Sequence, residues 1–347
     1  MSLPPTIVTN HDLARIMDTT DEWIVRRTGV RQRRIASRGT GSAELGASAV
    51  TAALNEAGVE PNDVDVLISA TMTPDHFAPG NAPLIQDRVG LGSIGCFEVR
   101  QQCAGFLYGL DLADMLIATE RAETVVVVGA EVHRGYMPYG ASFDILDGTS
   151  TADPTPEDYA RATETRAWSV LFGDAAAAMV LQSGTDGTGI LGTTLHSDGA
   201  QFDLIHVPAP GFVHEPWSSI AQIEAGLHEP TMNGKGLFKQ AVLRMPESIR
   251  DVLSESTYEL ADIDLIIAHQ ANQRILDGVA KQLGVDDSVV ASNIANYGNT
   301  TAATLPLLFD ECRRDGRVTE GSLVAFTAFG AGAHWGAALY KSPDAIA

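Results

Sequence analysis

Three residues far apart in the chain could together carry out acyl transfer, and the first of them is a cysteine. Cys103 follows an alternating strand pattern in FEVRQQCAGFLYGL and comes just before a helical pattern. A thiol at a helix N-terminus feels the helix dipole and free N–H groups, which stabilise the thiolate form. Such a thiolate can attack a thioester and hold the acyl group as a new thioester. An inert core cysteine is the alternative, because cysteine is among the most buried residue types.

A histidine and an asparagine occupy two other positions where catalytic side chains collect. His269 ends a buried strand pattern in LIIAHQANQRI, and we expect a helix to begin near Asn272. Ligand and catalytic sites in α/β folds gather at the carboxyl ends of strands. Asn299 follows Gly298 in NYGNTTAATLPLLF and precedes another helical pattern. A core histidine and an ordinary asparagine helix cap are the alternatives.

A glycine-rich turn, AFGAGAHWGAALY, lies between two strand patterns near the end of the chain. Glycines allow a plain tight hairpin, but such a turn can also aim a backbone N–H at an oxyanion. Each of these windows is a weak signal alone. Together they favour a nucleophilic thiol with polar partners.

The elements that must position these residues alternate between helix and strand. Helical patterns at 44–58 and 106–120 alternate with β-rich runs at 63–71 and 124–131, which indicates layered α/β with a mainly buried sheet. The second half repeats this order, since PNDVDVLISA resembles LADIDLIIAH and TVVVVGAE resembles SLVAFTAF. We therefore expect two duplicated halves, 1–184 and 185–347. Facing repeats would bring Cys103 opposite the Asn299 region, each opening a helix.

The least patterned stretch is 132–165, which is rich in Gly, Pro, Thr and Asp. It is interpreted as an inserted loop or cap in the N-terminal half, because loops of this length are usually functional lids or mobile segments.

Composition narrows the possible partners. The chain has 347 residues, 45% of them hydrophobic, so it can bury a large core. No leader pattern or apolar stretch of spanning length is present, and we expect a cytoplasmic protein without a membrane span. The net charge of −21 argues against nucleic acid as the main partner. The cysteines Cys96, Cys103 and Cys312 form no CxxC pair, so neither a disulfide nor a metal site is expected.

Several arginines nevertheless cluster on this acidic chain. A cluster of this kind is a candidate seat for a phosphate-bearing ligand, and a solvated loop is the alternative. Its members are Arg26, Arg27, Arg31, Arg33, Arg34 and Arg38.

The chain resembles the β-ketoacyl-acyl-carrier-protein synthase III family of the thiolase superfamily. The resemblance covers nearly the whole chain and rests on windows in the family's order: TTDEWIVRRTGVRQRRIA, QQCAGF, LFGDAAAAMVL, GLFKQAV, AHQANQRI, YGNTTAA and FGAGAHWG. It implies a five-layer α-β-α-β-α fold and condensation of an acyl-CoA primer with a malonyl thioester, with loss of CO2, in fatty acid biosynthesis. The coenzyme A thioester is then a substrate, and no cofactor is implied. An acyl carrier protein and a second copy in a homodimer are the implied partners.

The same resemblance assigns roles to individual residues. Cys103 would be the nucleophile, while His269 and Asn299 would bind the carbonyl of the extender thioester. The oxyanion hole would be formed by Cys103 with Gly330 and Ala331. Coenzyme A would be bound by Thr19, Trp23, Arg27, Arg166, Asn272 and Arg274. Phe238, Lys239 and Lys281 would line the tunnel and the carrier-protein face, and Phe77, Ala78 and Phe329 the acyl pocket.

The acyl pocket departs from relatives that prefer acetyl groups. Those relatives carry a Phe directly before the proline of the loop that closes the partner's tunnel, whereas this chain has Ala78 before Pro79 and Phe77 one place earlier. Each additional buried methylene favours binding by roughly 0.8 kcal/mol. The sequence therefore predicts a preference for primers longer than acetyl.

Other functions remain open at this point. Relatives in secondary metabolism keep the acyl-cysteine but pass the acyl group to a hydroxyl or amine. Head-to-head condensation of two long acyl thioesters, or condensation of the 3-hydroxy-3-methylglutaryl type, would need an extra carboxylate as base. Glu131 is the candidate for this base, and the alternative is that it is an ordinary residue at the end of a strand. A papain-like protease is disfavoured by the internal duplication. A non-catalytic scaffold would be expected to lose one of Cys103, His269 and Asn299, but all three are present.

Overall fold

The computed structural model describes residues 1–184 and 187–343, and two four-stranded sheets form its centre. The first sheet has the order β4-β3-β5-β6, with β3 at Val66–Ala70, β4 at Gly95–Val99, β5 at Thr124–Glu131 and β6 at Ala175–Gln182. The second has the order β10-β11-β12-β7, with β7 at Gly189–Ser197, β10 at Leu265–Ala268, β11 at Leu323–Gly330 and β12 at His334–Lys341.

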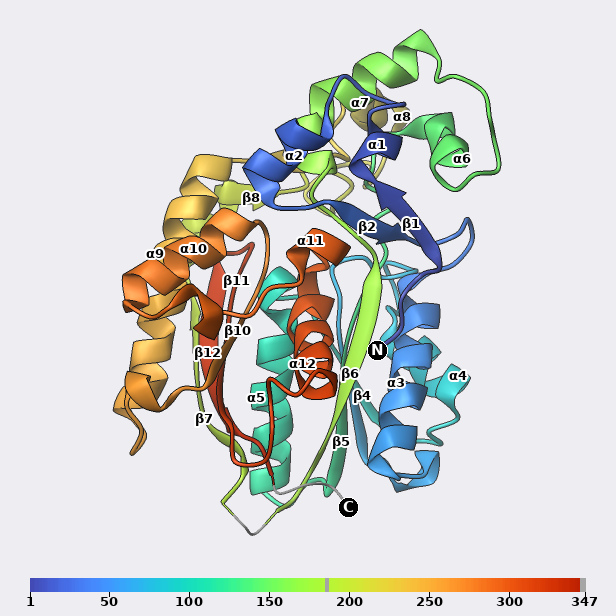
Figure 1. The fold of residues 1–347 in the computed structure, drawn as a ribbon. Coiled ribbons are helices and arrows are strands. Elements are labelled where there is room, and N and C mark those ends of the chain that lie inside the picture. The colour runs from blue at the N-terminus through green and yellow to red at the C-terminus, as the bar shows by residue number, and fades with distance from the viewer. Residues whose placement is uncertain (185–186, 344–347) are drawn as a thin grey trace.

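Helices cover both sheets and fill the space between them, as Figure 1 shows. The central layer holds α5 (Gly105–Ala118) and α12 (Thr304–Arg314), which contact both sheets. Outside the first sheet lie α3 (Ser42–Ala57) and α4 (Ala82–Val89), and outside the second lie α9 (Gly234–Ser254) and α10 (Gln273–Leu283). The predicted five-layer fold is confirmed.

The two halves repeat one strand arrangement. β3 runs parallel to β5, which pairs antiparallel with β6. In the second half β10 runs parallel to β11, which pairs antiparallel with β12. Every residue of β5 and of β11 is buried, as expected for strands covered by helices on both faces. The expected boundary between the halves, 184/185, meets residues 185–186, which lie outside the described part.

A cap covers one end of the layers, at the top of Figure 1. It contains β1 (Thr6–Thr9) paired with β2 (Gln32–Ile35), and the helices α1 (Asn10–Leu13), α2 (Asp21–Thr28), α6 (Phe143–Leu146), α7 (Pro156–Ser169) and α8 (Ile220–Glu224). The pair β8 (Ile205–His206) and β9 (Thr231–Met232) lies nearby. Residues 132–165 therefore are not a plain loop, because they contain α6 and most of α7. Thr155 caps α7 by accepting from the Asp158 N–H, and Pro156 is the first helical residue.

Short helices complete the chain. The remaining α-helix is α11 (Ile294–Tyr297), and the 3-10 helices are η1 (Pro61–Asp63), η2 (Gln102–Ala104), η3 (Gly140–Ser142), η4 (Gly199–Leu204), η5 (Leu260–Asp262), η6 (Asp287–Val289) and η7 (Thr301–Ala303). Two of these, η2 and η7, lead directly into the central helices α5 and α12 and contact each other. Among the described residues, no helix is both long and apolar enough to cross a membrane.

Candidate active site

Cys103 lies where the edge strand β4 turns into the central helix α5. It is the middle residue of η2, and α5 begins two residues later at Gly105. The preceding residue, Gln102, has a φ of 53°, in the left-handed region that non-glycine residues rarely adopt. The predicted strand-to-helix position of Cys103 is therefore what the structure has.

The electrostatic surroundings of Cys103 differ from the sequence expectation. Burial raises the pKa of the Cys103 thiol to about 12, and the nearby Glu131 carboxylate raises it further, while a hydrogen bond to the cysteine's own backbone acts in the opposite direction. The residue itself is half-buried. A helix N-terminus favours the thiolate, whereas burial and the Glu131 carboxylate favour the neutral thiol. The free site holds a neutral thiol, and attack on a thioester must remove its proton.

The glycine-rich turn packs directly against the backbone of η2. A Cβ added at Gly330 would lie 3.1 Å from the Cys103 nitrogen and 2.9 Å from the Ala104 nitrogen. Only glycine lets the two backbones approach this closely. The turn that continues through Ala331 thus lies beside the Cys103 N–H, where an oxyanion hole requires a second donor.

Asn299 is buried, with 4% of its surface exposed, and its amide orientation is fixed. Its backbone N–H donates to the Leu171 carbonyl at 2.8 Å. Its side-chain Oδ1 accepts from the Thr301 N–H at 2.9 Å, which leaves the Nδ2 group as a donor toward a ligand. The preceding Gly298 has a φ of 66°, and a Cβ there would lie 2.6 Å from the Leu171 carbonyl oxygen.

His269 follows β10 directly, as predicted, and only 4% of its surface is exposed. Its backbone N–H donates to the Thr327 carbonyl at 2.8 Å. Burial lowers the pKa of His269 from 6.5 to about 4, and a backbone hydrogen bond with Thr301 opposes this shift. The ring is therefore neutral at physiological pH, and Nδ1 is buried without a hydrogen-bond partner. A neutral imidazole can donate a hydrogen bond to an enolate without transferring its proton fully.

The three segments meet around Thr301 and Glu131. Thr301 hydrogen-bonds to Asn299 through its N–H and has a backbone hydrogen bond with His269. Glu131 acts electrostatically on Cys103 and accepts from the Ala302 N–H at 3.4 Å. Burial raises the pKa of Glu131, whereas His133 and the hydrogen bonds to the carboxylate lower it. Sequence reasoning considered Glu131 only as an extra base and did not foresee these contacts.

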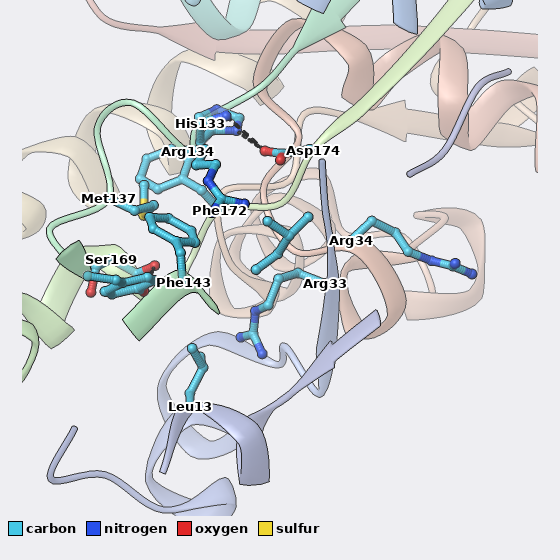
Figure 2. A pocket seen from close by; sticks show the side chains of 12 residues that line it. Leu13, Arg33, Arg34, His133, Arg134, Met137, Phe143, Ser169, Phe172 and Asp174 are labelled. Atoms are coloured by element: carbon cyan, nitrogen blue, oxygen red, sulfur yellow. Dashed lines mark hydrogen bonds and ion pairs between the residues drawn. The ribbon is translucent and has the colours of Figure 1, made fainter. Parts of the chain in front are cut away.

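A second buried polar pair lies behind Phe172, on the side of the cap. Figure 2 shows His133 and Asp174 facing each other, with 3.2 Å between Nδ1 and Oδ1. The His133 ring stacks on Phe172 at 4.9 Å. His133, Phe172 and Asp174 line a small cavity of about 20 Å³, which is large enough for a water molecule. Arg33, Arg134 and other cap residues complete its lining. Cys103 does not line this cavity.

The predicted coenzyme A residues lie on helices that pack together. The end of α2 lies on the start of α10, since a Cβ at Gly29 would be 2.6 Å from the Gln273 Cβ. The Trp23 ring has the Arg27 guanidinium 4.1 Å and the Arg166 guanidinium 5.0 Å from its centroid. The Thr19 hydroxyl is buried without a partner.

The other predicted binding residues extend along α9 and α10. Asn272 caps α10 by accepting from the Ile275 N–H. Arg274 lies over the Phe238 ring, 5.7 Å from its centroid. Lys239 and Lys281 are exposed.

The arginine cluster is not one binding surface. Arg33 is buried and donates to Asn10 and to the Val8 and Val170 carbonyls. Arg34 donates to the Pro4 and Pro5 carbonyls, and Arg38 pairs with Asp144 at 2.7 Å. Only Arg26, Arg27 and Arg31 are exposed without such internal contacts among the described residues. The sequence expectation of a single seat for phosphate is therefore wrong for the buried Arg33, while Arg34 and Arg38 have partners within the chain.

The predicted acyl-pocket residues are not gathered within one chain. Phe77 is 53% exposed and contacts the rings of Phe212 and Trp217, each at 5.6 Å. Ala78 is exposed beside it. Phe329 is buried and stacks on Trp335. In the described part of the chain, no cluster of three or more His, Cys, Asp or Glu side chains could hold a metal ion.

Two duplicated α/β halves, in each of which a 3-10 helix leads into a central helix, define the thiolase-like class. A solved structure of 3-oxoacyl-(acyl carrier protein) synthase III from Pseudomonas aeruginosa PAO1 has the same fold, with a TM-score of 0.82 and 36% identity, covering 99% of this chain and 96% of that one. The chain belongs to the 3-oxoacyl-[acyl-carrier-protein] synthase III family. The model of its C-terminal part matches residues 253–342, and the synthase III model matches 97–141 and 155–199.

Relatives of this family match the chain over almost its full length. A β-ketoacyl-[acyl-carrier-protein] synthase III from Erythrobacter litoralis is 38% identical over 98% of this chain and 96% of its own. The enzyme named synthase III 3 from Streptomyces coelicolor is 40% identical over 98% of this chain and 95% of its own. The family model leaves residues 142–154 unmatched between its two segments, within the cap stretch 132–165.

Proposed function

We propose that the protein condenses an acyl-CoA primer with a malonyl thioester, with loss of CO2, through an acyl group held on Cys103. The observation that carries the proposal is a pair of neutral donors, His269 and Asn299, that both contact Thr301 of η7, the 3-10 helix that packs against the thiol-bearing η2. Burial keeps His269 uncharged, and the Thr301 N–H turns the Asn299 amide so that Nδ2 can donate. A site that only moves an acyl group to a hydroxyl or amine has no need for two donors aimed at an enolate oxygen.

The reaction runs in two halves. In the first, the Cys103 sulfur attacks the acyl-CoA carbonyl, the thiol proton passes to the leaving coenzyme A thiolate, and the oxyanion lies between the Cys103 N–H and the turn of Gly330 and Ala331. In the second, the malonyl thioester loses CO2 while His269 and Asn299 hydrogen-bond its carbonyl oxygen. The resulting enolate carbon attacks the acyl-cysteine carbonyl, which frees the thiol and yields the 3-oxoacyl thioester.

The coenzyme A surface is proposed on α2, α7 and α10. Trp23 offers an aromatic face for the adenine, and Arg27 and Arg166 lie over that ring already. The unpaired Thr19 hydroxyl and the exposed Arg274 would complete the contacts. Lys239 and Lys281 would supply a local basic rim on an acidic protein, which suits an acidic carrier protein. The coenzyme A thioester is a substrate here, and the cytoplasmic location stays a prediction.

A homodimer is proposed through the free edge of the first sheet. β4 is the edge strand of that sheet, and its Phe97 is 43% exposed. An exposed apolar edge strand invites pairing with another chain. Static light scattering should give the mass of a dimer at micromolar concentration. Phe97→Asp should shift the mass toward the monomer, whereas a monomeric wild type contradicts the proposal.

Mass spectrometry after incubation with acyl-CoA tests the central claim. The acyl mass should appear on Cys103 and be absent in Cys103→Ser, while the control Cys96→Ser should load normally. The loaded enzyme should then release CO2 from a malonyl thioester and form a 3-oxoacyl product. An acyl group on Cys96 or Cys312, or transfer to a hydroxyl or amine without CO2 release, would refute the proposal.

A further inference from the structure

Glu131, a buried carboxylate with no task in the two half-reactions, connects two segments of the site. It ends β5 and has 0% of its surface exposed. Its oxygens accept from the Thr73 hydroxyl at 2.6 Å, the Thr71 hydroxyl at 3.3 Å and the Met72 N–H at 3.1 Å. On the other side it accepts from the Ala302 N–H at 3.4 Å. The carboxylate thus joins the segment after β3 to η7.

η7 begins with a residue in an unusual conformation. Thr301 has a φ of 47°, a region that β-branched residues adopt only when their surroundings hold them there. Its hydroxyl hydrogen-bonds to Glu131 and lies 3.5 Å from the His133 Nε2 atom. Its N–H donates to the Asn299 Oδ1 atom at 2.9 Å. The conformation of Thr301 therefore decides which end of the Asn299 amide faces a ligand.

We propose that Glu131 is a positioning residue that holds Thr301 in its left-handed conformation and so orients Asn299 for the extender half-reaction. This inference rests on the proposed function, because it assigns Glu131 to one of its two halves. Through residues 71–73, Glu131 also ties the catalytic asparagine to the chain that continues to the exposed Phe77 and Ala78.

The contacts of Glu131 favour positioning over proton abstraction. The Oε1 atom accepts from the Met72 and Ala302 N–H groups, and the Oε2 atom accepts from the two threonine hydroxyls and Met72. With the Thr301 hydroxyl these are five donor groups around a carboxylate that has about four lone-pair sites, so its capacity is occupied. A general base needs a lone pair directed at the proton it removes. The extra base that head-to-head condensation would require is therefore not Glu131.

Three Glu131 variants and a matched control separate these roles. Glu131→Ala should lower kcat for malonyl-thioester decarboxylation at least about tenfold, since removing one oriented donor costs roughly 100-fold in other sites. The KM for the malonyl thioester should rise by no more than about threefold, and the rate of Cys103 acylation should fall by no more than about threefold. Glu131→Gln should restore most of kcat, because its amide oxygen still accepts and the threonine hydroxyls can turn to accept from its NH2 group. Glu131→Asp keeps the charge but shortens the reach, and should lose kcat without losing the fold.

Asp65→Asn is the control, because Asp65, the residue before β3, holds the end of β5 opposite to Glu131. Asp65 accepts from the Glu123 N–H at 2.7 Å and the Thr124 N–H at 2.9 Å, where β5 begins. This variant should lower thermal stability and leave both half-reactions unchanged.

Two results would overturn the inference. Glu131→Gln as slow as Glu131→Ala would mean that the charge or a proton, not the acceptor, matters. A crystal structure of Glu131→Ala or Glu131→Asp in which Thr301 keeps its left-handed φ and its bond to Asn299 would also refute it. That structural test holds even if the wild-type enzyme releases no CO2, a result that would refute the proposed function instead.

Discussion

Replacing Gly330 with alanine should displace the backbone of the thiol segment. The added Cβ would lie 2.7 Å from the Gln101 carbonyl oxygen, 2.9 Å from the Ala104 nitrogen and 3.1 Å from the Cys103 nitrogen, whereas ordinary contacts begin at 3.4 Å. All three neighbours are backbone atoms at or next to η2. They cannot rotate away, so η2 and the turn must separate by roughly half an ångström.

This separation affects both stability and rate. Overpacking of this kind costs about 1–3 kcal/mol of stability. A misplacement of about 1 Å can cost roughly 100-fold in rate, so half of that predicts about a tenfold loss in kcat/KM for acylation of Cys103. The loss arises because the Cys103 N–H and the turn no longer face the same oxyanion.

Rapid-quench mass spectrometry of Cys103 acylation and thermal unfolding measure the two effects. Gly192→Ala is the matched control, because Gly192 lies in β7 of the same sheet and its added Cβ would meet only Val252, at 3.7 Å. The control should acylate at the wild-type rate. If Gly330→Ala also acylates at the wild-type rate, the argument that this close approach builds the oxyanion site is refuted.

Three further predictions concern the histidine, the acyl pocket and the coenzyme A surface. Folding lowers the pKa of His269 from 6.5 to about 4, so between these values the unfolded chain binds a proton that the folded chain does not. The free energy of unfolding should therefore fall by about 2 kcal/mol more between pH 7 and pH 5 in wild type than in His269→Gln. Denaturant titration at the two pH values measures this difference, and equal pH slopes would contradict it. Wild type should load butyryl- to octanoyl-CoA with a higher kcat/KM than acetyl-CoA. Ala78→Phe should reverse that order, because a larger side chain removes room for methylenes, each of which contributes roughly 0.8 kcal/mol when buried. Faster acetyl loading by wild type would refute the predicted preference for longer primers. Trp23→Ala should raise KM for acyl-CoA at least about fivefold, because base–aromatic stacking contributes roughly 1–3 kcal/mol, and should leave KM for an acyl-N-acetylcysteamine thioester unchanged; equal changes in both would show a general distortion.

The sequence predicted those features that depend on local pattern and internal repetition. The strand-to-helix position of Cys103 could be identified because strand and helix periodicities meet there. The duplication could be identified because β3 and β10 have matching apolar runs. The cap helix α7 was missed, although Thr155 and Pro156 carry an ordinary helix-start signal, because the surrounding Gly, Pro and Thr residues obscured it.

Other properties depend on residues distant in the chain. The raised pKa of Cys103 comes from burial and from Glu131, which no local pattern around the cysteine indicates. The burial of Arg33 depends on carbonyls of Val8 and Val170, so its charge looked available in the sequence. The role of Glu131 was hidden for the same reason, since its donors come from residues 71–73 and 302.

Gln102 and Thr301 place the same unusual backbone turn at corresponding points of the two halves. Each is the first residue of a 3-10 helix that opens a central helix, and their φ angles are 53° and 47°. Glycine accepts such angles without strain, so Gln102→Gly and Thr301→Gly relax the same distortion at two places in one molecule. One turn precedes Cys103, which is proposed to carry the acyl group, and the other follows Asn299, which is proposed to bind the extender. The two variants therefore make the same kind of change in backbone freedom, once beside Cys103 and once near Asn299. Each variant can then be compared for its effect on one half of the same catalytic cycle.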